Sequence, residues 1–309
     1  MTNEEHYIKL LEKSRNEDII AFLQQLSVDE RKALAVPVKK LAKEYFAYQQ
    51  NGNSWSSKAN EKQREILHYS FFACYNKKEI ERENPTWLLS REHLRKLLPW
   101  YCPSWLNDYV NSFAEKDWLP YALDYDYLIE LSNDRLLQPL PRLIARKLVS
   151  AIFEQKDKKQ LFVPEKLLKH AATLEEHIWY LFQYETNIHT ASNWLYGLED
   201  KEQQNWETVL TTFVTEGKID KHRILKESLL AANRNFNKSL SGWFADLFWR
   251  LEPSVDDAVA LQPEVFNLST SPHSKVVNAA LQGCKAIYDR KEFCASNFLD
   301  HVPVLLTSD

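Results

Sequence analysis

Apolar residues recur along most of this chain in steps of three and four, the spacing that places side chains on one face of a helix. The clearest stripe consists of Phe236, Leu240, Trp243, Phe244, Leu247 and Leu251. A later stripe contains Val276, Ala280, Cys284 and Ile287. Because each such helix must bury its apolar face against a neighbour, the pattern predicts an all-α protein of packed helices.

Local signals indicate where these helices begin and end. Three pairs fit the capping box, in which a hydroxyl side chain and a carboxylate three residues later cap a helix reciprocally: Thr2 with Glu5, Ser27 with Glu30, and Thr173 with Glu176. Pro37 should kink or split a helix within 27–50. Gly217 suits a left-handed C-terminal cap, and Asp220 can begin the next helix. Ser271-Pro272 predicts a further helix start.

A run of charged residues, 154–160, suggests how the chain is organised. It is either a domain boundary or a loop within one array. Taken as a boundary, it separates an irregular helical N-terminal region, 1–155, from a helical-repeat region, 161–309. The stretch 160–163 is a short strand candidate, but we expect it to lead into a helix at Pro164.

The repeat region contains an internal echo. Residues 265–272 and 302–309 share apolar and hydroxyl positions thirty-seven residues apart, and periods near forty are typical of helical-pair repeats. The stretch 268–287 resembles the turn and second helix of a HEAT repeat, through Pro272, Val276, Ala279, Ala280 and Ile287. It departs at Val277, where that pattern usually has Arg. The resemblance implies a HEAT-like α-solenoid, an α-α superhelix. Because the second copy of the echo ends at Asp309, where a partner helix would follow, we expect the solenoid to continue into a longer protein.

A second resemblance covers 217–254. This stretch is similar to part of a family of long, uncharacterised bacterial proteins, a domain of unknown function that ends in HEAT-like repeats. The matching positions are Ile219, Asp220, Arg223, Leu225, Arg234, Phe236, Trp243, Phe244 and Pro253. The departure is Asn235, where an acidic residue is expected. The resemblance implies a helical-repeat fold and supplies no activity.

Composition excludes several functions. With five glycines, the chain has no glycine-rich phosphate-binding loop. A net charge of −4 lacks the basic surplus typical of nucleic-acid-binding domains. The four cysteines fit no zinc pattern, and they are typical of buried thiols in a reducing compartment. The N-terminus is polar and acidic, and the sequence has no long apolar run, so we expect a cytoplasmic protein that does not span a membrane.

Candidate chemistry is sparse. Asp124, Asp126 and Glu130 cluster, but a capping or solvated role is favoured, and the nine histidines are dispersed without metal-ligand spacing. We therefore expect no catalytic residues, no metal and no cofactor. The candidates for a binding groove are Arg234, Asn235, Trp243, Arg250, Trp100 and Trp105.

Together these observations predict a non-enzymatic helical-repeat scaffold or protein-binding module, because stacked helix pairs expose long grooves. Two alternatives remain open. One is a nucleic-acid-binding HEAT-like protein, which requires Lys and Arg to gather on one surface. The other is a hydrolytic enzyme whose site assembles only in three dimensions, which requires a pocket with titratable groups of shifted pKa.

Overall fold

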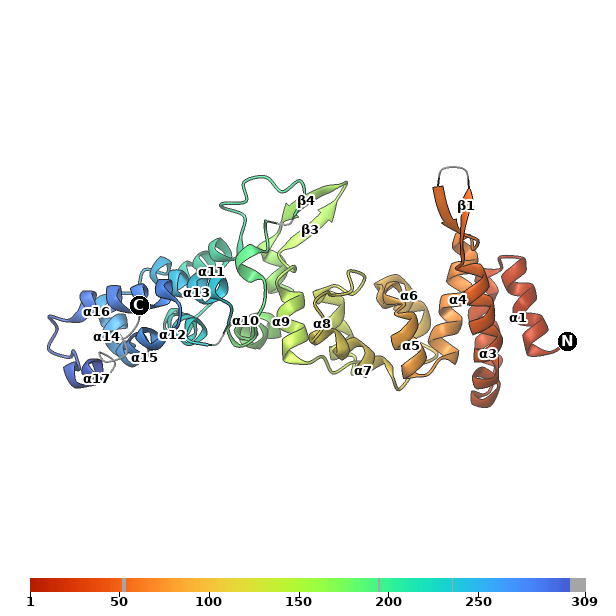
Figure 1. Ribbon diagram of the computed structural model, residues 1–309, viewed down its shortest axis with the longest axis horizontal. Helices are drawn as coiled ribbons and strands as arrows, with labels where there is room; N and C mark the ends of the chain where they lie inside the picture. The colour runs from red at the N-terminus through yellow and green to blue at the C-terminus, as the bar shows by residue number, and fades with distance from the viewer. Residues whose placement is uncertain (52–53, 194, 235, 301–309) are drawn as a thin grey trace. The chain divides into compact units, whose positions relative to one another are not determined.

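The computed structural model describes residues 1–51, 54–193, 195–234 and 236–300, and most of them are helical (Figure 1). The expected helical class is thus confirmed. The chain divides into two compact units, Met1–Leu140 and Pro141–Asp309. Within the described residues, the strands form two antiparallel hairpins: β1 (Tyr48–Asn51) with β2 (Ser54–Ser57), and β3 (Phe153–Lys156) with β4 (Lys159–Phe162).

The first unit is built around α4 (Glu61–Cys74), which packs against the three helices that precede it, α1 (Asn3–Glu12), α2 (Asn16–Gln25) and α3 (Val28–Tyr45). From Ile66 onward, most side chains of α4 are buried. The later elements are α5 (Lys77–Glu83), η1 (Thr86–Leu89), α6 (Arg91–Leu97), α7 (Leu106–Asn111), η2 (Ser112–Ala114) and α8 (Tyr125–Asn133).

Capping in the first unit largely follows the sequence. The capping boxes at Thr2 and Ser27 are present, and Asp124 caps α8 by accepting a hydrogen bond from the N–H of Tyr127 at 2.7 Å. The expected split at Pro37 is wrong, because α3 runs through it without interruption. Since Ala33 is exposed, water can bond the carbonyl that Pro37 leaves without a partner.

In the second unit, α12 (Lys221–Ala232) packs against α13 (Lys238–Arg250) and α15 (Gln262–Asn267), while α13 also packs against α16 (Ser274–Ile287). The stripe expected along α13 is largely buried, with Leu240, Phe244 and Leu247 each inaccessible to solvent. The other elements are α9 (Pro141–Leu148), η3 (Pro164–Leu168), a π-helical turn η4 (Thr173–His177), α10 (Ile178–Gln183), η5 (Ile188–Thr190), α11 (Trp206–Thr215), α14 (Val255–Ala260), η6 (Leu268–Thr270) and α17 (Ala295–Leu299).

Two expected caps in the second unit are confirmed and two are wrong. Gly217 has a φ of +70°, and Asp220 accepts a hydrogen bond from a backbone N–H of α12 at 2.6 Å. Thr173 is buried inside the π-helical turn, so it is not the N-cap residue of a helix. Ser271 does not begin a helix, because α16 starts at Ser274 after His273.

The charge run 154–160 lies inside the second unit as the β3–β4 hairpin. Its turn residues, Asp157 and Lys158, have φ values of 49° and 65°, the left-handed region used by tight hairpin turns. Of the strand candidate 160–163, residues 160–162 lie in β4, and η3 follows at Pro164. Of the echoed phrases, 265–272 forms the end of α15, η6 and the approach to α16, whereas 302–309 lies outside the described residues.

Candidate binding groove

A groove in the first unit lies where the start of α3, the end of α4 and the start of α5 meet the loop that precedes α7. Its volume is about 440 Å³. That volume is within the range of known ligand sites. The lining residues are Val28, Arg31, Lys32, Ala73, Cys74, Tyr75, Asn76, Lys77, Tyr101, Ser104, Trp105 and Asp108.

The floor of this groove is apolar and held in place. Trp105 is only 7% exposed, and its indole N–H donates a hydrogen bond to the carbonyl of Tyr75 at 3.0 Å. The same indole packs edge-on against Phe72, with ring centroids 5.5 Å apart. α6 (Arg91–Leu97) ends before this loop, and Pro99 and Pro103 disfavour further helix within it. The loop therefore turns Trp105 into the core beneath the groove rather than presenting it to solvent.

The rim of the groove carries three cations. The guanidinium of Arg31 lies over the ring of Tyr101, 4.6 Å from its centroid. Lys77 forms an ion pair with Asp108 at 2.8 Å. Lys32 lies beside the exposed carboxylate of Asp29 at 3.6 Å. In the part of the chain that the structure describes, no carboxylate lies within ion-pair distance of Arg31.

Burial keeps the titratable groups of the floor neutral. It raises the pKa of the Cys74 thiol to about 12, although the nearby Arg31 opposes this shift. Burial also raises the pKa of the Tyr101 hydroxyl. Neither group is therefore an ionised nucleophile at neutral pH. The charge of the lining comes from Arg31, Lys32 and Lys77 against one aspartate.

The candidates that the sequence placed near this groove differ in exposure. Trp105 forms part of the floor, and the part-buried Trp100 stacks on Tyr101 with centroids 5.6 Å apart. Arg91 and Lys96, which precede these rings in the sequence, pair with Glu130 and Glu65, at 2.6 and 3.2 Å. Arg31, Lys77 and Tyr101 were missed, because nothing in the local sequence relates these three positions.

The remaining candidates belong to the second unit. Arg250, exposed at the end of α13, pairs with Glu207 at 2.7 Å. Trp243 is part-buried and packs edge-on against Phe244, with centroids 5.0 Å apart. Arg234 is exposed in the turn after α12, and Asn235 lies outside the described residues. The structure therefore gives Arg250 an ion-pair role and leaves Arg234 on the surface.

A second pocket in the first unit, of about 340 Å³, lies between α4 and the η1–α6 segment. Its lining includes His68, whose Nε2 accepts a hydrogen bond from the Trp87 indole N–H at 3.2 Å. Burial lowers the pKa of His68 to about 2, and it also lowers the pKa of His93. Ser90, which caps α6, is hydrogen-bonded to Nδ1 of His93. Both imidazoles are therefore neutral at pH 7.

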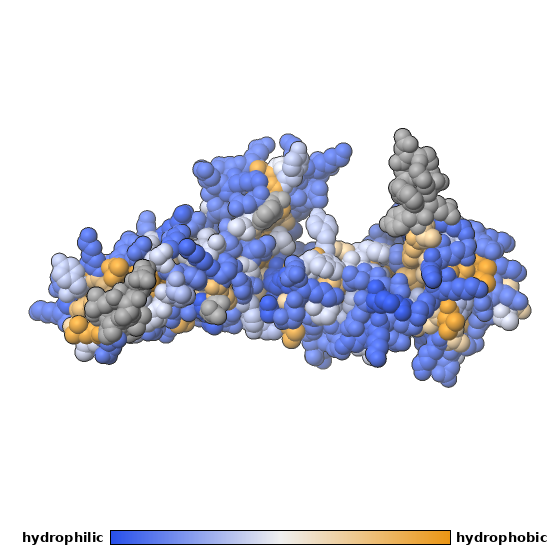
Figure 2. Space-filling model, in the orientation of Figure 1, coloured by the Kyte–Doolittle hydropathy of each residue, from blue (hydrophilic) through white to orange (hydrophobic). Residues whose placement is uncertain are grey.

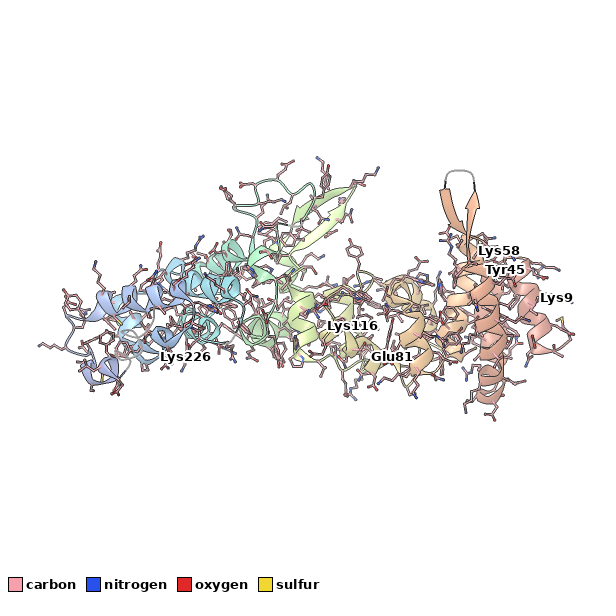
Figure 3. The ribbon with its side chains drawn as sticks, viewed as in Figure 1. Lys9, Tyr45, Lys58, Glu81, Lys116 and Lys226 are labelled. Carbon is pink, nitrogen blue, oxygen red and sulfur yellow. The ribbon has the colours of Figure 1, made fainter. Side chains whose placement is uncertain are left out.

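The visible surface of the first unit is mainly polar. Figure 2 shows a mostly hydrophilic visible face on the first unit, with hydrophobic residues in small patches. Figure 3 shows Lys58 beside Tyr45, where its ammonium lies 5.0 Å from the ring centroid.

Among the described residues, no cluster of three or more His, Cys, Asp or Glu side chains is arranged to hold a metal ion. None of the described helices combines the length and apolar character that a membrane span requires.

The first unit is thus a helical domain with a groove that combines an apolar floor and a cationic rim. The chain belongs to a family of uncharacterised domains, the domain of unknown function DUF6493, whose model matches residues 1–309. This confirms the expected membership of an uncharacterised domain family. Comparisons with curated proteins and with solved structures found no match.

Proposed function

We propose that this protein is a non-enzymatic helical protein-binding module and that the groove between α3, α4, α5 and the loop before α7 holds a segment of its partner. The observation that supports this proposal is the arrangement of apolar and charged groups in the groove. Protein interfaces place buried apolar and aromatic contacts at the centre and polar groups at the rim. The floor at Cys74 and Trp105 and the rim at Arg31, Lys32 and Lys77 have that arrangement.

A HEAT-like solenoid in the second unit is part of the proposal. It is supported by the packing of α12 against α13 and α15, and of α13 against α16, because stacked helix pairs contact their neighbours in this manner. A bacterial, cytoplasmic protein is also proposed. The four cysteines Cys74, Cys102, Cys284 and Cys294 are unpaired, as is common in a reducing compartment.

The test is quantitative affinity capture from the native host with two matched double variants. Lys32→Glu/Lys77→Glu reverses two rim charges, and Lys39→Glu/Lys78→Glu makes the same change in charge on the same two helices outside the groove. We expect a reproducible partner to be recovered with wild type and with the Lys39/Lys78 variant, and lost with the Lys32/Lys77 variant. Equal recovery with both variants would exclude the groove, and recovery of chaperones alone from wild type would exclude a binding module.

A hydrolytic enzyme is the second candidate, and the Ser90–His93 contact is the observation that favours it. A neutral histidine bonded to a serine hydroxyl is the pairing from which activated nucleophiles are built. Here, however, the same hydroxyl also accepts a hydrogen bond from the His93 backbone N–H at 3.3 Å, as an ordinary helix cap does. Covalent labelling of Ser90 by a fluorophosphonate probe, absent in Ser90→Ala, would establish this alternative.

A further inference from the structure

The guanidinium of Arg31 is the charged group of the groove that has no ion-pair partner among the described residues. It is part-buried over Tyr101, and no described carboxylate lies within ion-pair distance. We infer that the partner segment is acidic: an apolar side chain lies on the floor above Trp105, and an adjacent Asp or Glu pairs with Arg31. The inference rests on the proposed function, since it names the chemistry of the segment that occupies the same groove.

The position of Arg31 suits a carboxylate. The guanidinium carbon lies over the Tyr101 ring, 4.6 Å from its centroid. An arginine that lies over an aromatic face can offer the N–H groups of its planar fork to a carboxylate. Two parallel N–H···O bonds to a carboxylate are a strong and directional pairing. Because the side chain is already held by the ring, little conformational entropy is lost when the carboxylate binds.

The remaining charges of the rim also favour a negatively charged partner. Lys77 and Asp108 pair with each other and are both about half-exposed, at 47% and 58%. This pair therefore adds no net charge to the lining. Arg31 and Lys32 give the lining its positive balance, and a basic segment would meet repulsion from both. Lys32 adds long-range attraction, although the exposed Asp29 screens part of it.

The inaccessible aromatic rings of the floor favour a peptide over a single-stranded nucleic acid as the occupant of the groove. Binding of unpaired bases depends on accessible aromatic faces on which the bases stack. Trp105 is 7% exposed, and one face of Tyr101 is occupied by Arg31. What the floor offers is apolar contact from Ala73, Cys74 and the buried indole, which matches an aliphatic or aromatic side chain.

The experiment is selection of a random dodecapeptide library on the full chain, with removal of peptides that also bind Lys32→Glu/Lys77→Glu. We expect the enriched sequences to combine an apolar residue with neighbouring Asp or Glu and to carry a net negative charge. The affinity of a selected peptide is then measured with Arg31→Gln and with Lys39→Gln, which removes one charge from an exposed site on the same helix.

Loss of the Arg31 pairing should weaken binding by about tenfold or more, whereas Lys39→Gln should bind as wild type does. Exchange of the peptide's Asp and Glu for Asn and Gln should weaken binding equally, and high salt should weaken the wild-type complex. Circular dichroism and thermal melting verify that Arg31→Gln is folded. If it is not, Lys32→Gln takes its place, with an expected loss of about threefold because its side chain is exposed.

The outcomes separate the two proposals. Groove-dependent peptides that are neutral or basic would overturn the acidic partner and leave the binding module standing. Tighter binding of an oligothymidine than of any selected peptide, lost in Arg31→Gln, would overturn the acidic peptide in favour of a nucleic acid. A selection without a single groove-dependent peptide would overturn both the acidic partner and the groove as a peptide site.

Discussion

Acidification should destabilise the first unit through one histidine, His68. The Trp87 indole N–H donates a hydrogen bond to Nε2 of this ring, which must therefore carry no proton there. Protonation at Nε2 would place two N–H donors, that of His68 and that of Trp87, opposite each other without an acceptor between them. Burial, with smaller repulsive contributions from His93 and Arg64, lowers the pKa of His68 to about 2. The unfolded chain takes up the same proton near pH 6.5.

The size of the effect follows from this difference in pKa. A depressed folded pKa means that the stabilising contribution is complete above about pH 6.5 and is lost as the pH falls towards the folded value. In that interval, each pH unit removes about 1.4 kcal/mol of unfolding free energy. Between about pH 7 and pH 5, the loss through His68 is therefore about 2 kcal/mol, a large fraction of the stability of a typical domain.

The matched variants are His68→Gln, which keeps an acceptor for Trp87 but does not titrate, and His6→Gln on α1. Urea-dependent hydrogen–deuterium exchange of α4 peptides, corrected for intrinsic exchange rates, reports the free energy of unfolding of this unit. We expect wild type and His6→Gln to lose about 2 kcal/mol more than His68→Gln between about pH 7 and pH 5. His93 is present in all three chains, so it does not affect the comparison. An equal loss in all three would refute the assignment of a neutral, part-buried His68.

Other substitutions test the second unit. Gly283→Ala should cost about 1–3 kcal/mol in urea unfolding, because its Cβ would lie 2.6 Å from Cγ1 of Val265, and Val265→Ala in the same chain should recover part of this. A stability unchanged by Gly283→Ala would contradict the packing. Arg250→Ala should destabilise more at pH 7 than at pH 4. Burial already raises the pKa of Glu207, whose carboxylate would lose its ion pair but can protonate at low pH. That pH dependence should vanish when Glu207→Gln is added, and its persistence would contradict the pairing. Asp220→Ala should lower the stability of α12 by about 1 kcal/mol, measured by thermal unfolding, and no change would argue against the cap.

The parts of the fold that the sequence predicted correctly depend on neighbouring residues. The stripe along α13 and the caps at Thr2, Ser27 and Asp220 act within one or two turns, so spacing reveals them. The tight turn at Asp157-Lys158 could not be predicted because Lys158 adopts the left-handed conformation at a position where glycine is usual. A charge run was therefore interpreted as a boundary or a loop.

The groove could not be predicted from spacing. Its parts come from α3, α4, α5 and the loop before α7, and Arg31, Lys77 and Tyr101 meet only after the chain folds. In the sequence, Arg31 lies within a run of charged residues that resembles any solvated helix face. Trp105 stands out in the sequence for its neighbouring rings, but its role as a buried floor depends on the carbonyl of Tyr75, thirty residues away.

The measurement that tests the central claim most directly is site-specific photo-crosslinking in the native host. Ser104 is exposed and lines the groove, so a benzoylphenylalanine placed there reports on what occupies it. The matched position is Lys40, which is exposed on α3 outside the groove. We predict a discrete protein adduct from position 104 that is absent from position 40 and is lost when Lys32→Glu/Lys77→Glu is added. No adduct at position 104, or the same adducts at both positions, would contradict a partner-binding groove.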